Sequence, residues 1–281
     1  MNPLRLPYGL PGVVAILVLT MRLGQAEADS PPAAPTKPGF TGTPLQAQGT
    51  WHIHDAHRPR PPVVVPGQCG TDKGPGRPPS DAEVLLGQRP DLSKWEHEDG
   101  AAPTWLMKGG VLQTGRGALQ TKQVYRDFQL HVEWATPKDV KGDGQARGNS
   151  GVFLLGKFEV QVLDSFENET YADGQASALY GQVPPLVNAA LPPGRWQTYD
   201  IVFRAPRFVD GNKLESPAIV TVLHNGVVTH AGASFFGPTA HKSNPPYTPE
   251  DAQGPLRLQD HGNHVLFRNI WIRPLKAYDE P

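Results

Sequence analysis

Cysteine is nearly absent from this chain. Cys69 is the single cysteine among 281 residues, which excludes an intramolecular disulfide. An excess of one charge is also missing, since 26 Lys and Arg stand against 27 Asp and Glu; this balance argues against a nucleic-acid partner. No apolar run reaches the ~20 residues of a transmembrane helix, and no long stretch repeats with the helical period. These absences favour a fold built from strands and held by its core.

Residues 1–28 predict an export signal. Arg5 supplies a positive charge, residues 13–21 are apolar, and Ala26 and Ala28 form an A-x-A-like cleavage site. An uncleaved N-terminal anchor is the alternative. We expect an exported protein, periplasmic or secreted, with no transmembrane span in the mature chain.

Residues 29–81 are expected to form a proline-rich N-terminal arm. His52, His54 and His57 lie close together in it and suggest a metal site. No carboxylate or cysteine cluster completes such a site nearby, so an arm packed on the domain surface is favoured.

From residue 82 onward the sequence changes to short alternating or apolar runs. Gly, Pro, Asp or Asn interrupt these runs roughly every 8 to 12 residues, as in antiparallel sandwiches. Asn225-Gly226, between two β-rich runs, predicts a hairpin turn. We predict an all-β sandwich over residues 82–275, followed by a short tail, 276–281.

Two segments carry a family resemblance: "GNSGVFLLGKFEVQVLDSF" and "GPLRLQDHGNHVLFRNIWIRPL". Residues 82–275 resemble the 3-keto-disaccharide hydrolase domain, also called domain of unknown function 1080. The resemblance implies a concanavalin A-like jelly-roll β-sandwich of two curved antiparallel sheets with a concave carbohydrate-binding face. It also implies cleavage of oligosaccharides or glycosides that carry a ketone at carbon 3, and a companion sugar 3-oxidoreductase that makes the ketone. Where relatives often have Arg, this chain has Lys157, a weaker bidentate partner.

Strand alternation selects the candidate site residues. In "FEVQV", Phe158, Val160 and Val162 share one face, while Glu159 and Gln161 share the other. The segment "LRLQDHG" likewise separates its leucines from a polar set. We predict catalytic roles for Glu159, His261 and Asp260, and substrate-binding roles for Gln161, Arg257, Gln259, Asn149, Lys157, Asp164 and Tyr180.

The chemistry implied by the resemblance is elimination followed by hydration. A ketone at carbon 3 acidifies the hydrogen on carbon 2, so the reaction needs a base, a leaving-group acid and a cation for the enolate. His261 suits proton transfer near neutral pH, Arg257 could stabilise the enolate, and Asp164 and Asp260 could orient His261 or cap turns. Which of Glu159 and His261 is the acid stays open.

Two other functions remain. A lectin-like module would bind sugar without chemistry. A conventional endoglucanase is disfavoured because Gln161 replaces the middle carboxylate of its usual strand motif. Glu133 is a second candidate carboxylate. No cofactor is certain, and a divalent metal is possible.

Overall fold

The computed structural model describes residues 38–40, 42–47, 49–89 and 91–276. The chain divides into two compact units, with the boundary along the chain between Arg58 and Pro59. In the first unit the described segments form turns and isolated bridges, such as Leu45 with His52. The predicted export signal, 1–28, lies outside the described residues.

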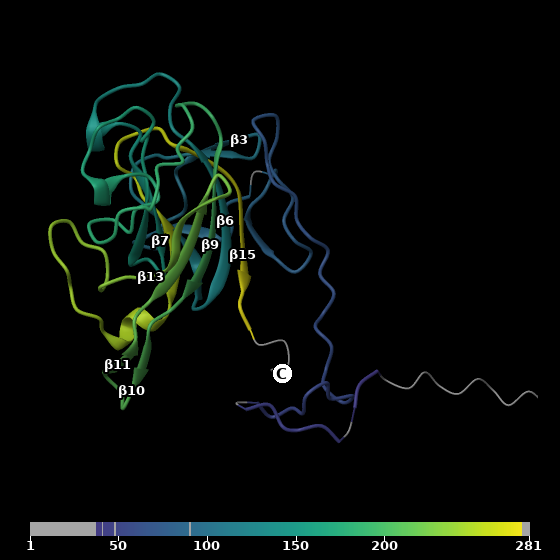
Figure 1. Cartoon of the computed structure of the whole chain (residues 1–281). Coiled ribbons are helices and arrows are strands. Elements are labelled where there is room, and N and C mark those ends of the chain that lie inside the picture. The colour runs from purple at the N-terminus through teal and green to yellow at the C-terminus, as the bar shows by residue number, and fades with distance from the viewer. Residues whose placement is uncertain (1–37, 41, 48, 90, 277–281) are drawn as a thin grey trace, which may run out of the picture. The chain divides into compact units, whose positions relative to one another are not determined.

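The second unit is a sandwich of antiparallel sheets (Figure 1). The larger sheet has eight strands, in the order β13 (Val227–Ser234), β12 (Ile219–His224), β9 (Gln197–Arg204), β6 (Phe128–Ala135), β15 (Leu266–Pro274), β4 (Val111–Gln113) and β3 (Leu106–Lys108), with β1 (Glu83–Leu86) also paired to β15.

The smaller sheet has five strands, in the order β2 (Trp95–His97), β5 (Leu119–Tyr125), β14 (Gly254–Leu258), β7 (Ser150–Leu154) and β8 (Phe158–Val162). A two-stranded ribbon joins β10 (Arg207–Val209) to β11 (Lys213–Ser216), and three short 3₁₀ helices span Gly144–Ala146, Ala172–Gly174 and Pro249–Ala252. The predicted all-β jelly-roll sandwich is confirmed.

The core lies between the two sheets because each strand buries one face. Phe158, Val160 and Val162 of β8 are fully buried, as are Trp134 and Phe203 from the larger sheet. The opposite faces of the strands carry the polar residues, as period-two alternation requires. The outer face of the five-stranded sheet therefore presents the polar side chains of β7, β8 and β14.

The predicted hairpin forms between β12 and β13. Its two turn residues, Asn225 and Gly226, have φ values of 52° and 79°, and His224 pairs with Val227 across the turn. Two consecutive positive φ values define the turn that matches strand twist, and Asn-Gly tolerates them best. This local signal is confirmed.

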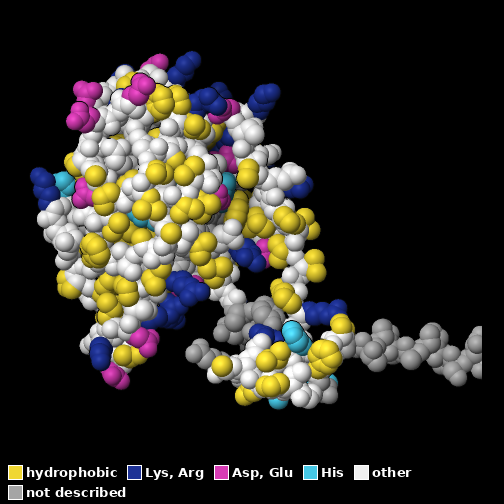
Figure 2. Space-filling view, viewed as in Figure 1, with side chains coloured by type: hydrophobic (Ala, Val, Ile, Leu, Met, Phe, Trp, Pro, Cys, Tyr) yellow, Lys and Arg dark blue, Asp and Glu magenta, His cyan; other side chains and the backbone are white. Residues whose placement is uncertain are grey.

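The surface carries both charges. On the face seen in Figure 2, the described Lys and Arg side chains form small separate groups rather than one basic patch. Among the described residues, no helix is long and apolar enough to cross a membrane.

Candidate active site

A cavity of about 580 Å³ opens on the outer face of the five-stranded sheet. Strands β7, β8 and β14 supply its floor, and the segments before β7, after β8, after β13 and after β14 supply its walls. We call it the candidate site. Its lining residues are Gln145, Asn149, Phe153, Glu159, Gln161, Tyr171, Tyr180, Thr239, Ala240, His241, Arg257, Gln259 and His261. Seven residues selected from the sequence are among them: Glu159, Gln161, Arg257, Gln259, His261, Asn149 and Tyr180.

Glu159 provides the buried carboxyl group of the candidate site. It belongs to β8 and is 3% exposed. Burial raises its pKa to about 8, and the positive charge of Arg257 opposes that rise only in part. Since a carboxyl with this pKa is mainly protonated at pH 7, Glu159 has a proton to donate.

Arg257 provides the positive charge. It is the cross-strand partner of Phe153, and its Cζ atom lies 4.1 Å from the centroid of that ring. Its Nη1 atom donates to Glu98 Oε1 at 2.5 Å. The ring and the carboxylate hold the guanidinium at the cavity, where its other N–H groups suit a developing oxyanion.

A network of amides lines the adjoining wall, and Gln145 is its centre. Its Oε1 accepts a hydrogen bond from Gln161 Nε2 at 3.0 Å, and its backbone oxygen accepts one from Asn149 Nδ2 at 2.7 Å. These bonds fix the orientation of both amides. The side-chain oxygens of Asn149, Gln161 and Gln259 are buried without a hydrogen-bond donor from the described protein. Buried acceptors of this kind are suited to sugar hydroxyls.

A chain of hydroxyl and imidazole groups lies at the rim. Tyr171 Oη and Tyr180 Oη are 3.0 Å apart, and Tyr180 Oη lies 3.2 Å from His241 Nδ1. Burial raises the pKa of Tyr180, so its hydroxyl stays protonated. Thr239 Oγ1 accepts the backbone N–H of Glu159 at 2.9 Å.

Sequence reasoning missed Gln145, Phe153, Tyr171, Thr239 and His241. Gln145 falls in a glycine-rich segment that the alternation of strands does not reach. The loop before Pro249 that contains Thr239 and His241 has no periodic pattern either. Only Phe153 had a usable signal, because it has the parity of Gly151 on the polar face of β7.

His261 and Asp260 occupy the turn after β14. His261 is exposed and lines the cavity. The Asp260 carboxylate accepts the backbone N–H of Gly262 at 2.8 Å and that of Gly117 at 3.0 Å. Asp260 thus caps the turn that carries His261 and is not among the residues that line the cavity. Its expected catalytic role stays a prediction.

Lys157 and Asp164 also lie outside the cavity lining, although the sequence analysis expected them to bind substrate. Lys157 Nζ donates to Asp251 Oδ1 at 2.6 Å and to the backbone oxygen of Glu250 at 2.9 Å. Asp164 Oδ2 accepts from Arg147 Nε at 2.7 Å. Both side chains are engaged by residues distant in sequence, which strand parity cannot anticipate.

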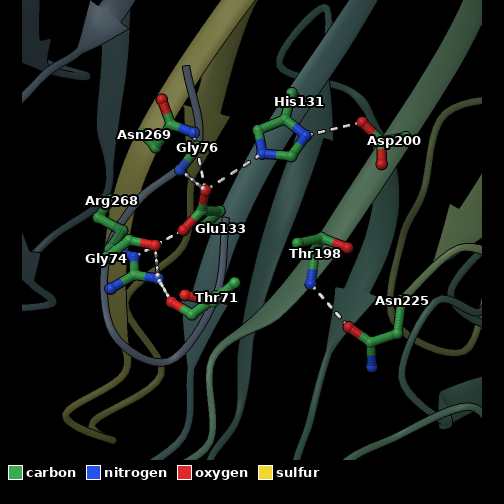
Figure 3. Close-up of polar contacts among 10 residues, drawn as sticks. All are labelled: Thr71, Gly74, Gly76, His131, Glu133, Thr198, Asp200, Asn225, Arg268 and Asn269. Carbon is green, nitrogen blue, oxygen red and sulfur yellow. Dashed lines mark hydrogen bonds and ion pairs between the residues drawn. The ribbon is translucent and has the colours of Figure 1, made fainter. Parts of the chain in front are cut away.

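Glu133, the second candidate carboxylate, lies on the other sheet (Figure 3). Its Oε2 accepts from Arg268 Nε at 2.6 Å, and its Oε1 accepts from Asn269 Nδ2 and from the backbone N–H of Gly76, both at 2.7 Å. Arg268 Nη2 donates in turn to the backbone oxygen of Thr71 at 2.6 Å. Glu133 therefore fastens residues 71–76 to the outer face of the larger sheet, away from the candidate site.

Glu133 and His131 each stabilise the charged form of the other. Burial alone would raise the pKa of Glu133, but His131, the Gly76 N–H, Asn269 and Arg268 outweigh it and lower the value to about 2. Burial would lower the pKa of His131, but Asp200, 2.7 Å from Nδ1, and Glu133 raise it to about 9. Both groups are charged at neutral pH.

The described residues hold no group of three or more His, Cys, Asp and Glu side chains that could bind a metal ion. That includes His52, His54 and His57. The expectation that a divalent metal takes part stays a prediction without an assigned site. Cys69 is an exposed free thiol.

Comparison with known proteins gives consistent results. The family model of the 3-keto-alpha-glucoside-1,2-lyase-like domain matches residues 81–273. A 3-keto-disaccharide hydrolase of Bacteroides thetaiotaomicron is 27% identical over 216 residues, which are 65% of this chain and 71% of the relative. A crystal structure from Parabacteroides distasonis, of a protein proposed to be a glycosyl hydrolase, is 40% identical with a TM-score of 0.72. The match covers 81% of this chain and 100% of that protein's chain.

A second crystal structure from Parabacteroides distasonis, also proposed to be a glycosyl hydrolase, is 20% identical with a TM-score of 0.50 and covers 70% of this chain and 94% of its own; it shares the fold. Together the family match and the relatives support a carbohydrate-active protein of glycosidase-like function.

Proposed function

The chain belongs to the family of 3-keto-alpha-glucoside-1,2-lyase-like domains, and from that premise we propose that it cleaves glycosides whose sugar ring carries a ketone at carbon 3. The observation that carries the proposal is the buried, protonated Glu159 on the same cavity floor as Arg257. The cleavage we propose is an elimination followed by hydration.

In the first step His261, the imidazole that lines the cavity, takes the proton from carbon 2. The electron pair of the broken C–H bond forms the double bond between carbons 1 and 2. The bond from carbon 1 to the leaving oxygen breaks, and Glu159 gives that oxygen its proton. Arg257 stabilises the negative charge that develops on the ketone oxygen.

In the second step the same groups act in reverse. Glu159, now a carboxylate, accepts a proton from water, and the water oxygen bonds to carbon 1 of the unsaturated ketone. His261 returns its proton to carbon 2. Both groups regain their starting protonation states, so the cycle consumes one water and needs no enzyme-bound covalent intermediate.

The assignment of Glu159 as acid follows from its raised pKa. A leaving-group acid must be protonated when substrate binds, and burial keeps Glu159 so up to about pH 8. The same burial removes water that would compete for the proton.

We also propose that the chain works outside the cytoplasm, because residues 1–28 have the sequence pattern of an export signal. An ordinary glycoside has no ketone at carbon 3, so its hydrogen on carbon 2 is not acidic enough for this elimination. A sugar 3-oxidoreductase must therefore supply the substrate. Such a companion would act before this enzyme on the same sugar.

The test is to incubate the mature protein with a methyl glucoside and with its 3-keto counterpart, with and without a divalent metal, and to follow methanol release. The proposal expects release from the keto sugar alone. Release from both would indicate a conventional hydrolase instead. Added chelator would show whether the predicted metal takes part.

A sugar-binding module without catalysis is the second candidate, and the buried amide oxygens of Asn149, Gln161 and Gln259 favour it. These groups can bind hydroxyls whether or not a reaction follows. If no substrate releases its aglycone while calorimetry detects sugar binding, the module is the better description.

A further inference from the structure

A second cavity, of about 500 Å³, lies between the segment 73–78 and strands β1, β4 and β15 of the eight-stranded sheet. Lys73, Arg77 and Arg268 line it, and none of its described lining residues is Asp or Glu. It shares no described lining residue with the candidate site. We call it the basic cavity. An excess of one charge around a cavity favours a ligand of the opposite charge.

Arg268 is the buried cation of the basic cavity, and its neighbours fix its position. It belongs to β15 and is 6% exposed. Its Cζ atom lies 3.9 Å from the centroid of the Trp196 ring. Its Nε donates to Glu133 at 2.6 Å, and its Nη2 donates to the backbone oxygens of Thr71 and Gly74 at 2.6 and 3.2 Å. The stacked ring and these bonds hold the planar guanidinium in one orientation.

The Nη1 atom of Arg268 is left without a partner. A guanidinium has five N–H donors, and the contacts to Glu133, Thr71 and Gly74 use three of them. The other two are on Nη1, which has no hydrogen bond within the part of the chain that the structure describes, and no dashed line reaches it in Figure 3. Nη1 is not one of the described atoms that are both fully buried and unpaired, so a ligand can reach it. Two oriented N–H donors on a cation suit the oxygens of an anion.

Lys73 and Arg77 supply the net positive charge of the basic cavity. Glu133 already offsets the formal charge of Arg268, whereas the exposed side chains of Lys73 and Arg77 have no hydrogen bond or ion pair with any described residue. The backbone that carries Arg77 is held in place, because Arg77 and Gln68 exchange backbone hydrogen bonds at 2.9 and 2.8 Å. Both cations therefore lie at the cavity without a counter-charge of their own.

The rest of the lining is partly apolar. Pro75, Pro78, Val84 and Val111 contribute to it, and Val84 is 39% exposed. The volume of the basic cavity falls within the roughly 300–1,000 Å³ of small-molecule sites, so a free phosphate ion would fill only a small part of it. An oxyanion carried on a ring fits better, because the ring can pack on the prolines and valines while the anion meets the cations.

We propose that the basic cavity binds a small ligand in which a carboxylate, sulfate or phosphate group is carried on a ring. The two N–H groups of Arg268 Nη1 bind the oxyanion, and Lys73 and Arg77 neutralise its charge. The buried cluster around Glu133 then has a second use, because it holds Arg268 in the orientation that the ligand needs. The inference does not depend on the proposed reaction, since the two cavities share no described lining residue.

The test is a calorimetric titration of the full chain with glucose 6-phosphate, glucuronate, inorganic phosphate and, as the neutral reference, glucose. None of these has a ketone at carbon 3, so the proposed reaction does not consume them. We expect at least one acidic sugar to bind about tenfold or more tightly than glucose, with an affinity that falls as sodium chloride is raised. The tighter of the two identifies the preferred oxyanion. Inorganic phosphate should bind more weakly than glucose 6-phosphate, because it has no ring.

Two pairs of variants locate the binding. The double variant Lys73→Gln/Arg77→Gln should weaken the tighter acidic sugar about tenfold or more. Its matched control is Lys122→Gln/Arg126→Gln, which removes the same charge from exposed residues that line neither cavity and should change the affinity less than about twofold.

The second pair tests the apolar wall. Val84→Trp narrows the basic cavity and should weaken the same ligand about threefold or more, whereas Val124→Trp, at an exposed valine of β5, should not. All of these variants are at exposed residues and leave the buried Glu133–Arg268 pair intact, so they test the site without disturbing the fold.

Three results would overturn the inference. The first is that neither acidic sugar binds more tightly than glucose. The second is an equal loss of affinity in the two double variants, which would indicate attraction to the overall charge and no specific site. The third is that Val84→Trp changes nothing or that inorganic phosphate binds as tightly as glucose 6-phosphate, since the ring would then have no place in the cavity. Failure of the proposed function has a separate signature, because the unmodified chain would release nothing from a 3-keto sugar.

Discussion

Arg257 lies over the ring of Phe153, its partner on the neighbouring strand, with 4.1 Å from Cζ to the ring centroid. A planar guanidinium can stack and still donate from its edge, whereas a lysine ammonium cannot. We expect Arg257→Lys to lower kcat/KM for a 3-keto-glucoside about 10²- to 10³-fold, the usual loss when an oxyanion donor is removed.

Arg273→Lys is the matched control for that variant. Arg273 is on the larger sheet and pairs with Asp81 at 2.6 Å, so its substitution should leave kcat/KM within twofold. Equal effects of the two substitutions would show that Arg257 has no special role in the reaction.

Glu159→Gln should reduce kcat about 10²- to 10⁴-fold, because an amide has no acidic proton to transfer. In the unmodified chain kcat/KM should fall as pH rises through about 8, since the protonated form of Glu159 is the active one. A pH–rate profile from pH 5 to 10 checks this. A rise through pH 8 would instead make Glu159 the base.

Glu159 should also make folding stability pH-dependent. Its folded-state pKa, about 8, is above the ordinary value of 4.5, so the folded protein binds the proton more tightly than the unfolded chain does. Stability is therefore full below about pH 4.5 and is lost as pH rises toward 8.

Glu159→Gln should remove this loss and be more stable than the parent at pH 8, on the order of a few kcal/mol. Denaturant titrations at pH 5 and pH 8 measure it. Glu169→Gln, on the exposed surface, should behave like the parent at both values. If the parent and Glu159→Gln lost the same stability between pH 5 and pH 8, Glu159 would not be buried as described.

Gln145 should act through its neighbours. The Gln145 side chain and backbone orient the amides of Gln161 and Asn149. Gln145→Ala removes the side-chain part of this support, so we expect KM to increase about tenfold with a smaller change in kcat. Gln123→Ala, at an exposed residue of β5, is the control. A large fall in kcat at unchanged KM would contradict a positioning role.

The Glu133–Arg268 pair should matter for stability and not for catalysis. Glu133→Gln leaves a buried guanidinium without its counter-charge, which costs about 3–5 kcal/mol, while kcat/KM per folded molecule should not change. Denaturant titration and active-site kinetics on the same sample separate the two effects. Asp81→Asn, which breaks an exposed pair with Arg273, should cost less than about 1 kcal/mol.

The sequence alone determined the strands and the polar face of the candidate site. Period-two alternation in "FEVQV" predicted that Phe158, Val160 and Val162 face the core and that Glu159 and Gln161 lie on the opposite face. The pair Asn225-Gly226 predicted the hairpin between β12 and β13. These features depend on neighbours a few residues apart, where backbone geometry fixes the direction of each side chain.

Only the tertiary structure decided which polar side chains meet, and how strongly each is buried. Lys157 is engaged by Asp251, 94 residues away, and Asp164 by Arg147, while Gln145 and His241 come to the cavity from loops without periodicity. Glu159 and Glu133 have the same alternation on their strands, yet burial raises the pKa of one and four polar neighbours lower that of the other. A carboxyl group's proton affinity is set by its surroundings in space, which the pattern along one strand does not contain.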